Sequence, residues 1–576
     1  MRLGDVVTFR GDRLFDGAVS LDWFTTDQRL STAAAEAFIF HGPTYHGVSQ
    51  GDVGLEHGHL LQDTATFARS VVHACYDAEP QPFALAIAGY GTGKSHLALA
   101  LATLLSAPDS PTAAAVLSRL QTADAAIGAE VKALLTEQLR PALVVALNGM
   151  RSFDLTSELT RQIGERVREQ GLNTEALDEL RPRFAQAANL VSMSDAGIVG
   201  DLLASCNMPD RDAVLQRLQA QEEHTYAQVH DFYEALGMPI RSLGGESVSD
   251  LIGVVTRTYC GEGRPFGRLL ILFDEFGRYT EFATERSQIA GNGVLQDLFE
   301  GVQSHSDEAC FVGFIQFELN AYVQRVAPEL RNEIVRYVTR YQSAKKSYLS
   351  TNLETLIASL MEKRQPTQLA QWLDGAESVA QSRRVQENIG KWYPQSAHYR
   401  LWNDPGQFHT VIRRGCWPLS PYSTWLLFYL SAAGKHLQER SALTLLGEAL
   451  ARHEDNDIDE TGARCGLAPV ELWSEGLQED LLTSEEGGAQ GSITHAYTSV
   501  EARHGAHLSE NQRRLLRAVV LASKLSLNVS SAEEAIEALS ALTGLDVAVT
   551  RAGMQQLQQE SNVLEWDDSF KGFSIL

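Results

Sequence analysis

Continuous apolar runs, each bounded by turn-forming residues, are the clearest pattern along the chain. They lie at 83–88 (FALAIA), 141–149 (PALVVALNG), 269–273 (LLILF) and 309–317 (ACFVGFIQF). Short runs without polar alternation are typical of strands that are buried on both faces of a parallel sheet. The segments between them, such as SELTRQIGERVREQG, instead repeat apolar residues at helical spacing. The pattern therefore predicts an α/β fold, with helices packed on a parallel sheet.

The turn after the first run is rich in glycine and leads into a helix-forming stretch. A strand, a glycine-rich loop ending in Gly-Lys-Ser and a helix are typical of a phosphate-binding loop, here in its permissive form because Ala88 replaces the first glycine. Successive backbone N–H groups of such a loop surround phosphates, Lys94 can reach the β and γ phosphates, and Ser95 can place its hydroxyl on Mg²⁺. ATP and Mg²⁺ are therefore the expected cofactors. The candidate nucleotide-binding residues are Gly89, Tyr90, Gly91, Thr92, Gly93, Lys94, Ser95 and His96.

A second motif follows the run at 269–273. That apolar strand ends in Asp274 and Glu275, and open α/β sheets bind ligands at the carboxyl ends of their strands. An aspartate there can hold Mg²⁺ together with Ser95, and an adjacent glutamate can orient and deprotonate a water. Alone, the two motifs are also explained as a glycine-rich turn and an ordinary acidic strand end. Together they predict an ATPase, with Ser95 and Asp274 as metal ligands and Glu275 as catalytic base.

The run at 309–317 carries a polar residue at its far end. Gln316 stands where a side chain at a strand tip can sense the γ phosphate, and we count it with Glu275 as a candidate catalytic residue. The same amide is equally well explained as a hydrogen-bonded side chain at the end of a strand. Both interpretations remain open at this point.

The length of the chain implies several domains. A chain of 576 residues is too long for one compact core, and about three or four domains are expected. Residues 1–60 are assigned to an N-terminal arm or subdomain, and residues 61–350 to a P-loop ATPase core. Lys94 and Asp274 are separated by far more than the roughly 30 residues of one βαβ unit. A helical insertion at about 150–265 is therefore predicted within the core.

Two helix-rich regions complete the predicted organisation. Residues 351–482 form a helical lid region, and residues 493–576 combine three helical patterns with a stretch, LEWDDSFKGFSIL, that fits a β-hairpin. Three helices and a hairpin predict a winged-helix-like domain. Its third helix offers Arg551 as its only cation, and Asp567 and Asp568 follow. A protein-contact or structural role is therefore favoured over DNA binding.

Composition narrows the choice of partners and compartment. A net charge of −25 excludes a broad phosphate-binding surface, so DNA contact is expected only through partners or a local surface. The six cysteines are scattered without a CxxC pair, which indicates reduced thiols in a cytoplasm rather than disulfides or zinc. No apolar run reaches the ~18 residues of a membrane-spanning helix, so no membrane association is expected.

Four short blocks carry a family resemblance. They read GYGTGKSHL, LFDEFGRY, CWPLSPYSTWLLFYLS and LQERSALTLLGEAL. The first two, with the Gln316 strand and the helical region after it, resemble the AAA+-type branch of P-loop ATPases that use a catalytic glutamate. All four resemble the large prokaryotic defence-island ATPases, the BrxC and PglY type of the BREX and phage-growth-limitation systems. Those relatives are usually longer, which leaves open whether this chain is a fragment of a longer protein.

The resemblance implies a role and an assembly. It implies a subunit of a multi-protein bacterial system for antiviral defence or DNA restriction, with other defence-system proteins as partners. It also implies a homo-oligomer in the ATP-bound state, in which an arginine of one subunit completes the site of its neighbour. The candidates for that arginine follow the Gln316 strand and are Arg325, Arg331, Arg336 and Arg340.

Two other functions are considered beside an ATPase that does conformational work. One is a nucleotide-dependent scaffold or signalling switch, in which ATP binding organises partners and hydrolysis is slow. The other is a DNA helicase, which the sequence supports less well. The chain shows neither a second RecA-like motif set nor a basic groove that could track a strand.

Overall fold

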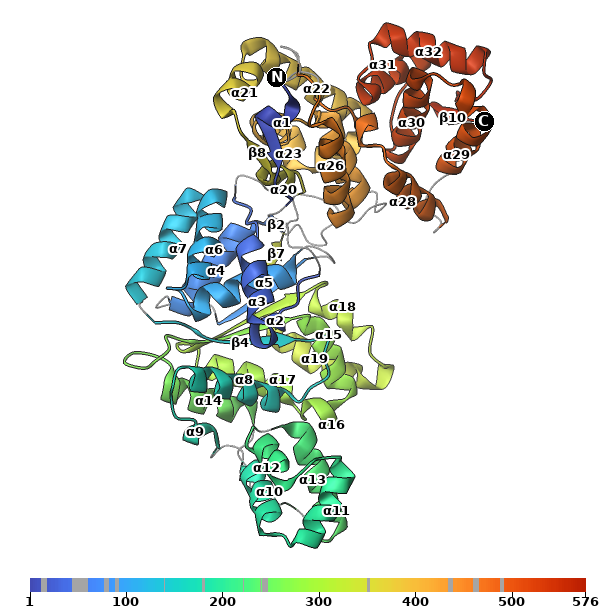
Figure 1. Ribbon diagram of the computed structural model, residues 1–576. Coiled ribbons are helices and arrows are strands. Elements are labelled where there is room, and N and C mark those ends of the chain that lie inside the picture. Colours follow the sequence, from blue (N-terminus) through green and yellow to red (C-terminus); the bar gives the residue numbers. More distant parts are fainter. Residues whose placement is uncertain are drawn as a thin grey trace. The chain divides into compact units, whose positions relative to one another are not determined.

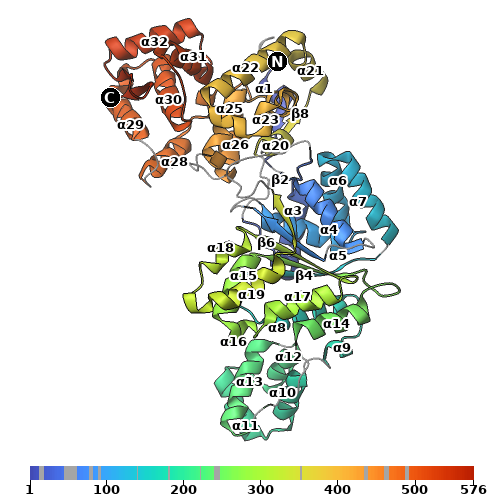
Figure 2. The same ribbon diagram turned by 180° about the vertical axis from the view of Figure 1, so that it is seen from behind.

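The computed structural model divides into two compact units, and each is described by itself (Figures 1 and 2). The sheet unit contains the described residues of 15–42 and 62–349, and the helical unit contains those of 1–14, 43–61 and 350–576. The residues that the structure describes are 1–11, 18–43, 61–76, 82–88, 93–138, 140–178, 182–220, 222–238, 240, 247–349, 353–433, 439–458, 466–486 and 492–576.

A mainly parallel sheet forms the centre of the sheet unit. Its strand order is β2-β7-β3-β6-β5-β4, with β2 (Leu61–Gln62) at one edge. The other five strands pair in parallel: β3 (Phe83–Ile87), β4 (Leu143–Asn148), β5 (Leu269–Asp274), β6 (Ala309–Ile315) and β7 (Lys345–Leu349). Every residue of β3, β5 and β6 is buried, as their uninterrupted apolar runs predicted. The predicted α/β class is confirmed.

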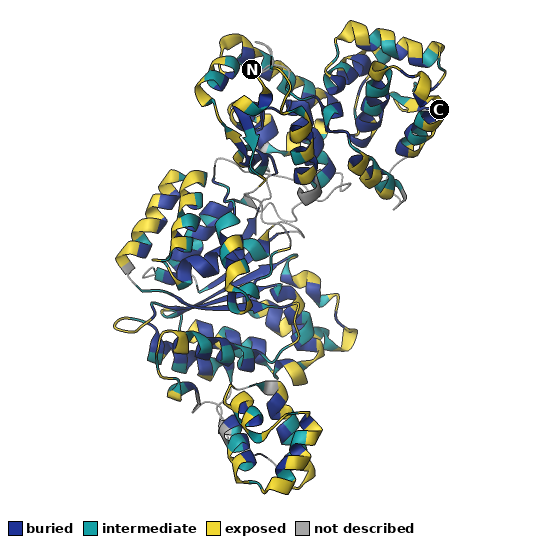
Figure 3. Ribbon diagram, in the orientation of Figure 1, coloured by how far each residue is buried: buried dark blue, intermediate teal, exposed yellow. Residues whose placement is uncertain are grey.

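Helices cover both faces of this sheet (Figures 1 and 2). One face carries α3 (Gln28–Ala37), α4 (Thr64–Tyr76), α5 (Lys94–Ser106), α6 (Pro111–Ala123) and α7 (Ala125–Gln138). The other carries α8 (Leu155–Glu169), α14 (Val248–Tyr259), α15 (Phe276–Glu285), α17 (Val294–Ser304) and α19 (Arg331–Tyr341). Residues 97–105 of α5 are all buried, as expected of a helix between a sheet and outer helices. Figure 3 shows the same burial along the strands.

The strand order brings distant segments together where the parallel strands end, here called the carboxyl edge of the sheet. The chain leaves β3 for the far strand β4, returns through β5 to β6 beside β3, and then crosses to β7 on the other side of β3. In the β4–β5 register Asn148 lies opposite Asp274, and in the β3–β6 register Ile87 lies opposite Ile315. The residues that follow these strands therefore meet at the carboxyl edge, where such sheets bind ligands.

Four helices between β4 and β5 form a separate small core. They are α10 (Pro182–Met193), α11 (Ala196–Cys206), α12 (Arg211–Gln219) and α13 (Glu223–Ala235), and they enclose buried residues that include Phe184, Leu202 and Tyr233. The helices α8 and α14, which also lie within 150–265, pack on the sheet layer instead. The segment between β4 and β5 thus supplies both a bundle and two of the covering helices.

The helical unit begins with the first residues of the chain. There β1 (Val7–Phe9) pairs antiparallel with β8 (Met361–Lys363), next to α20 (Leu353–Leu360). The described residues of 18–42 belong to the sheet unit instead. The segment 1–60, which the sequence analysis treated as one arm or subdomain, thus contributes to both units, because the β1–β8 pairing joins its start to residues far along the chain.

The C-terminal part of the helical unit contains the predicted three helices and hairpin. The helices are α30 (Glu510–Lys524), α31 (Ala532–Thr543) and α32 (Val547–Gln559), and they follow α28 (Glu475–Glu486) and α29 (Ile493–His504). The hairpin is formed by β9 (Leu564–Asp567) and β10 (Gly572–Ile575), which pair antiparallel. Among the described residues, no helix is both long and apolar enough to cross a membrane.

Candidate active site

The helix after the glycine-rich loop places Lys94 at the carboxyl edge of the sheet. Gly93 precedes α5 with a φ of 76°, a left-handed conformation that favours glycine, and Lys94 is the first helical residue. The Lys94 ammonium is buried and donates a hydrogen bond of 2.9 Å to the Ala88 carbonyl at the end of β3. Gly89, Tyr90, Gly91 and Thr92 lie outside the described residues, so the structure does not test their predicted role.

Burial and two carboxylates act on Lys94 in opposite directions. Burial lowers the pKa of Lys94, whereas the negative charges of Glu275 and Asp274 raise it. A lysine tail that has little water around it interacts more strongly with charge than an exposed one does. Lys94 is therefore suited to bind an anion that enters beside the two carboxylates.

Asp274 ends β5 beside the hydroxyl of Ser95. Burial raises the pKa of Asp274 to about 6, and a hydrogen bond from the Ser95 side chain opposes this increase. The pair brings together a hydroxyl and a carboxylate, which are oxygen ligands of the kind that Mg²⁺ prefers. The two predicted metal ligands, which are far apart in the sequence, thus lie next to each other and fit such an ion.

Glu275 occupies an unusual backbone position directly after β5. Its φ is 51° and its ψ is 37°, in the left-handed region that few residues other than glycine adopt, and it caps the start of α15. The Gln316 amide donates a hydrogen bond of 3.0 Å to one carboxylate oxygen of Glu275. The other carboxylate oxygen is buried and has no protein partner among the described residues. One oxygen of Glu275 is thus available to a small polar ligand such as water.

The residues at the end of β4 pack against the backbone of Asp274 and Glu275. The Gly149 N–H donates a hydrogen bond of 2.8 Å to the Asp274 carbonyl. A Cβ added to Gly149 would lie 2.3 Å from the Glu275 carbonyl oxygen, so only glycine permits this approach. The Asn-Gly turn after β4 therefore helps to fix the backbone of the two acidic residues.

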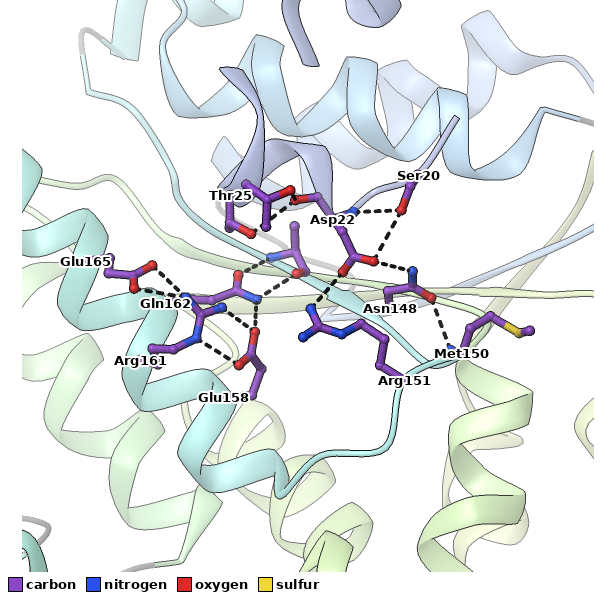
Figure 4. Close-up of polar contacts among 12 residues, drawn as sticks. Ser20, Asp22, Thr25, Asn148, Met150, Arg151, Glu158, Arg161, Gln162 and Glu165 are labelled. Carbon is purple, nitrogen blue, oxygen red and sulfur yellow. Dashed lines mark hydrogen bonds and ion pairs between the residues drawn. The ribbon is translucent and has the colours of Figure 1, made fainter. Parts of the chain in front are cut away.

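A polar cluster from the N-terminal segment holds the tip of β4 (Figure 4). The Asn148 amide donates to the Asp22 carboxylate at 2.7 Å, and Arg151 lies 3.3 Å from the other Asp22 oxygen. On the side of β4 that pairs with no further strand, the buried Gln162 side chain makes two hydrogen bonds with the Ala146 backbone, of 2.9 and 2.8 Å. The Gln162 bonds thus satisfy the backbone N–H and carbonyl of Ala146, with which no further strand pairs.

His96 contacts the N-terminal segment. Its ring Nε2 lies 2.6 Å from the Ala34 carbonyl, and the ring packs edge-on against Phe38 at 5.0 Å. Burial lowers the pKa of His96, while the bond to Ala34 raises it. In this structure the histidine joins α3 to α5. Its predicted contribution to nucleotide binding stays a prediction.

The four candidate arginines differ in their surroundings. Arg325 lies 3.7 Å from Glu281 and stacks over Phe317 at 4.7 Å, and Arg340 lies 3.3 Å from Glu300. Arg325 and Arg336 are exposed, and Arg331 is half-buried. Among the described residues, Arg336 makes no ion pair with a carboxylate, so its guanidinium is accessible to solvent.

Lys94, Ser95, Asp274, Glu275 and Gln316 lie together near the carboxyl ends of β3, β5 and β6. The sequence analysis did not identify Asp22, nor Tyr322, whose hydroxyl accepts a hydrogen bond of 3.3 Å from the Gln316 N–H. The Asn-Gly turn was the only signal at the β4 tip. No family model matches this chain, and no curated protein matches it either.

Proposed function

We propose that this chain is a Mg²⁺-dependent ATPase that hydrolyses ATP to ADP and phosphate. The observation that carries this proposal is the meeting of Lys94, Ser95, Asp274, Glu275 and Gln316 at one sheet edge. They lie at or after the ends of three strands that neighbour one another in the order β3-β6-β5. A cation, two metal-binding oxygens and a carboxylate with a free oxygen are the groups that phosphoryl transfer to water requires.

Binding is assigned to α5 and to the end of β5. Lys94 would neutralise charge on the β and γ phosphates, and the loop before it would supply backbone N–H groups. Ser95 and Asp274 would hold Mg²⁺, which when bound neutralises phosphate charge and orients the γ phosphate. Because the pKa of Asp274 is about 6, its carboxylate is mostly ionised at neutral pH and can act as a ligand.

Glu275 is assigned the role of base. Its free oxygen can accept a hydrogen bond from a water placed in line with the γ phosphate and can take the proton as the water attacks. Gln316 holds the other oxygen at 3.0 Å, which fixes the direction of the carboxylate. The same amide can also move to the γ phosphate, so that Gln316 would both orient the base and sense the nucleotide.

The finer fold assignment and the biological role are part of the same proposal. The position of the lysine helix after the central strand β3 and the adjacent acid pair after β5 support a P-loop NTPase core of the AAA+ type. The three helices and hairpin of the C-terminal part support a winged-helix-like domain. The proposed role as a subunit of an antiviral defence or DNA restriction system is supported by the resemblance of four sequence blocks.

A scaffold or switch with slow hydrolysis is the second candidate. One observation bears on it: the Gln316 amide binds Glu275 at 3.0 Å, and turnover would be slow if this contact turned the carboxylate away from the water instead of orienting it. Phosphate release with saturating ATP and Mg²⁺, with and without duplex DNA, separates the two. Turnover that DNA raises several-fold supports the ATPase that does work. Slow turnover that DNA does not change supports the switch, and absence of hydrolysis even in a single-turnover measurement contradicts both.

A further inference from the structure

A buried tyrosine contacts the backbone of Gln316 and the first turn of the helix that follows Glu275. Tyr322 lies in the short helix α18 (Leu319–Val323) just after β6 and is 1% exposed. Its hydroxyl accepts a hydrogen bond of 3.3 Å from the Gln316 N–H. The Tyr322 oxygen therefore holds the backbone that carries the Gln316 side chain.

The ring of Tyr322 also lies against the first turn of α15. A Cβ added to Gly277 would lie 2.2 Å from the ring Cζ and 2.5 Å from the hydroxyl oxygen. Gly277 is two residues after Glu275, which caps the same helix. The glycine thus leaves the space that the ring fills, and the ring limits how far the start of α15 can move.

A third contact fixes the ring from outside. The Arg325 guanidinium lies 5.0 Å from the centre of the Tyr322 ring and is itself bound to Glu281 of α15 at 3.7 Å. Tyr322 therefore lies among the tip of β6, the first turn of α15 and a cation that is bound to α15.

We propose that Tyr322 is a positioning residue that keeps the Gln316 amide and the Glu275 carboxylate aligned for hydrolysis. The inference rests on the proposed function. The Tyr322 hydroxyl fixes the position of the Gln316 backbone, and the Tyr322 ring fixes the position of the first turn of α15. The side chains of Gln316 and Glu275 then lie 3.0 Å apart. Since a displacement of a reacting group by ~1 Å can lower a rate about 100-fold, loss of either contact slows the chemical step. ATP binding, which depends on Lys94 and Ser95, is unchanged.

The test compares Tyr322→Phe with wild type in single-turnover hydrolysis and in Mg-ATP binding. The variant keeps the ring and removes the acceptor of the Gln316 N–H. We expect the rate to fall about tenfold, an intermediate value on the scale of misplacement, with an unchanged Kd. The matched control is Tyr341→Phe. Tyr341 is equally buried, and its hydroxyl donates to the Leu295 carbonyl at 3.1 Å in the body of the unit. The control should hydrolyse ATP at the wild-type rate.

A double-variant comparison separates positioning from general packing. In a Gln316→Ala chain the amide that Tyr322 places is missing, so adding Tyr322→Phe should change the rate less than twofold. A further full tenfold loss there would overturn the inference, because it would show that the tyrosine acts independently of Gln316. Gly277→Ala gives a second route, since its methyl must displace the ring, and it should lower the rate while leaving the Kd unchanged.

The outcomes also distinguish this inference from the function beneath it. An active wild type with an equally active Tyr322→Phe variant overturns the positioning role and leaves the ATPase standing. A wild type that binds Mg-ATP but shows no hydrolysis overturns the proposed ATPase, and the positioning role falls with it.

Discussion

Replacing Glu275 by glutamine removes the proposed base with the smallest change in shape. The glutamine has the same length as the glutamate, and its carbonyl can still accept the hydrogen bond from the Gln316 amide. Asp274, Ser95 and Lys94 keep their places, so Mg-ATP binding should stay within about twofold of wild type. What is lost is the group that takes the proton from water.

The size of the loss follows from the role of a general base. Proton transfer by a positioned side chain contributes about 10²–10⁴-fold to a rate, which corresponds to about 3–5 kcal/mol of transition-state stabilisation. Among the described residues, one Glu275 oxygen has no protein partner and the other is bound by the Gln316 amide, so the first oxygen is the one placed to take the proton. We therefore expect the upper part of this range.

The assay is single-turnover hydrolysis with excess enzyme, combined with an equilibrium measurement of Mg-ATP binding. The matched control is Glu285→Gln, because Glu285 is an exposed carboxylate at the other end of α15. This control variant should hydrolyse ATP at the wild-type rate. Hydrolysis by Glu275→Gln at the wild-type rate would refute the assignment of the base. Loss of both binding and hydrolysis would show instead that Glu275 acts on the bound nucleotide in its ground state.

Three further predictions follow from the charges at the site and on the surface. Since the pKa of Asp274 is raised from its ordinary value to about 6, a pH titration should show Mg²⁺-dependent activity falling as the pH drops through about 6. Without Mg²⁺, the contribution of Asp274 to the free energy of unfolding should be fully present below its ordinary pKa and should be lost as the pH rises through about 6. A profile flat from pH 5 to 8 would contradict the metal role. In a fluorescence-anisotropy titration, the 576-residue chain should bind duplex DNA with a Kd no lower than micromolar at physiological salt, because six cationic side chains of 493–576 form ion pairs with carboxylates. A sub-micromolar affinity that falls steeply with salt would contradict this prediction. Mixing Lys94→Ala with Arg336→Ala protein should restore part of the ATPase activity that each lacks alone, and sedimentation that finds only monomers with ATP while the wild type hydrolyses would exclude an arginine acting in trans.

The central strands could be predicted because their environment dictates their composition. A strand covered on both faces must be apolar, and β3 and β6 are so throughout, whereas β4 and β5 are so up to their last residues, Asn148 and Asp274. The strand β7 escaped prediction because it begins with Lys345 and Lys346, which are only partly covered. Lys346 is bound to Glu318 at 2.6 Å, a contact between side chains that local sequence does not reveal.

The residues that lie together at this end of the sheet could be chosen from the sequence, but their alignment could not. Lys94, Ser95, Asp274 and Glu275 belong to motifs whose spacing is local. The hydrogen bond between Gln316 and Glu275 depends on β6 lying beside β5, and strand order is a long-range property. The left-handed backbone of Glu275 was likewise hidden, because a glutamate gives no sign that its neighbours will hold it in a conformation that costs about 1–3 kcal/mol.

The N-terminal segment shows the same limit. Asp22 reaches Asn148 across 126 positions of sequence, and β1 pairs with β8 across a still longer distance. Local composition assigned residues 1–60 only to an N-terminal arm or subdomain. Pairing partners, which were absent from that description, determine where each part of the segment packs.

The most direct test of the account is the binding of Mg-ATP to wild-type and Lys94→Ala protein, measured by calorimetry. Removing a buried, charged hydrogen-bond donor from phosphate should weaken binding about 10–100-fold, while Lys132→Ala, at an exposed lysine of α7, should bind as wild type does. If wild type does not bind Mg-ATP, or if Lys94→Ala binds it equally well, the carboxyl edge of this sheet is not a nucleotide site.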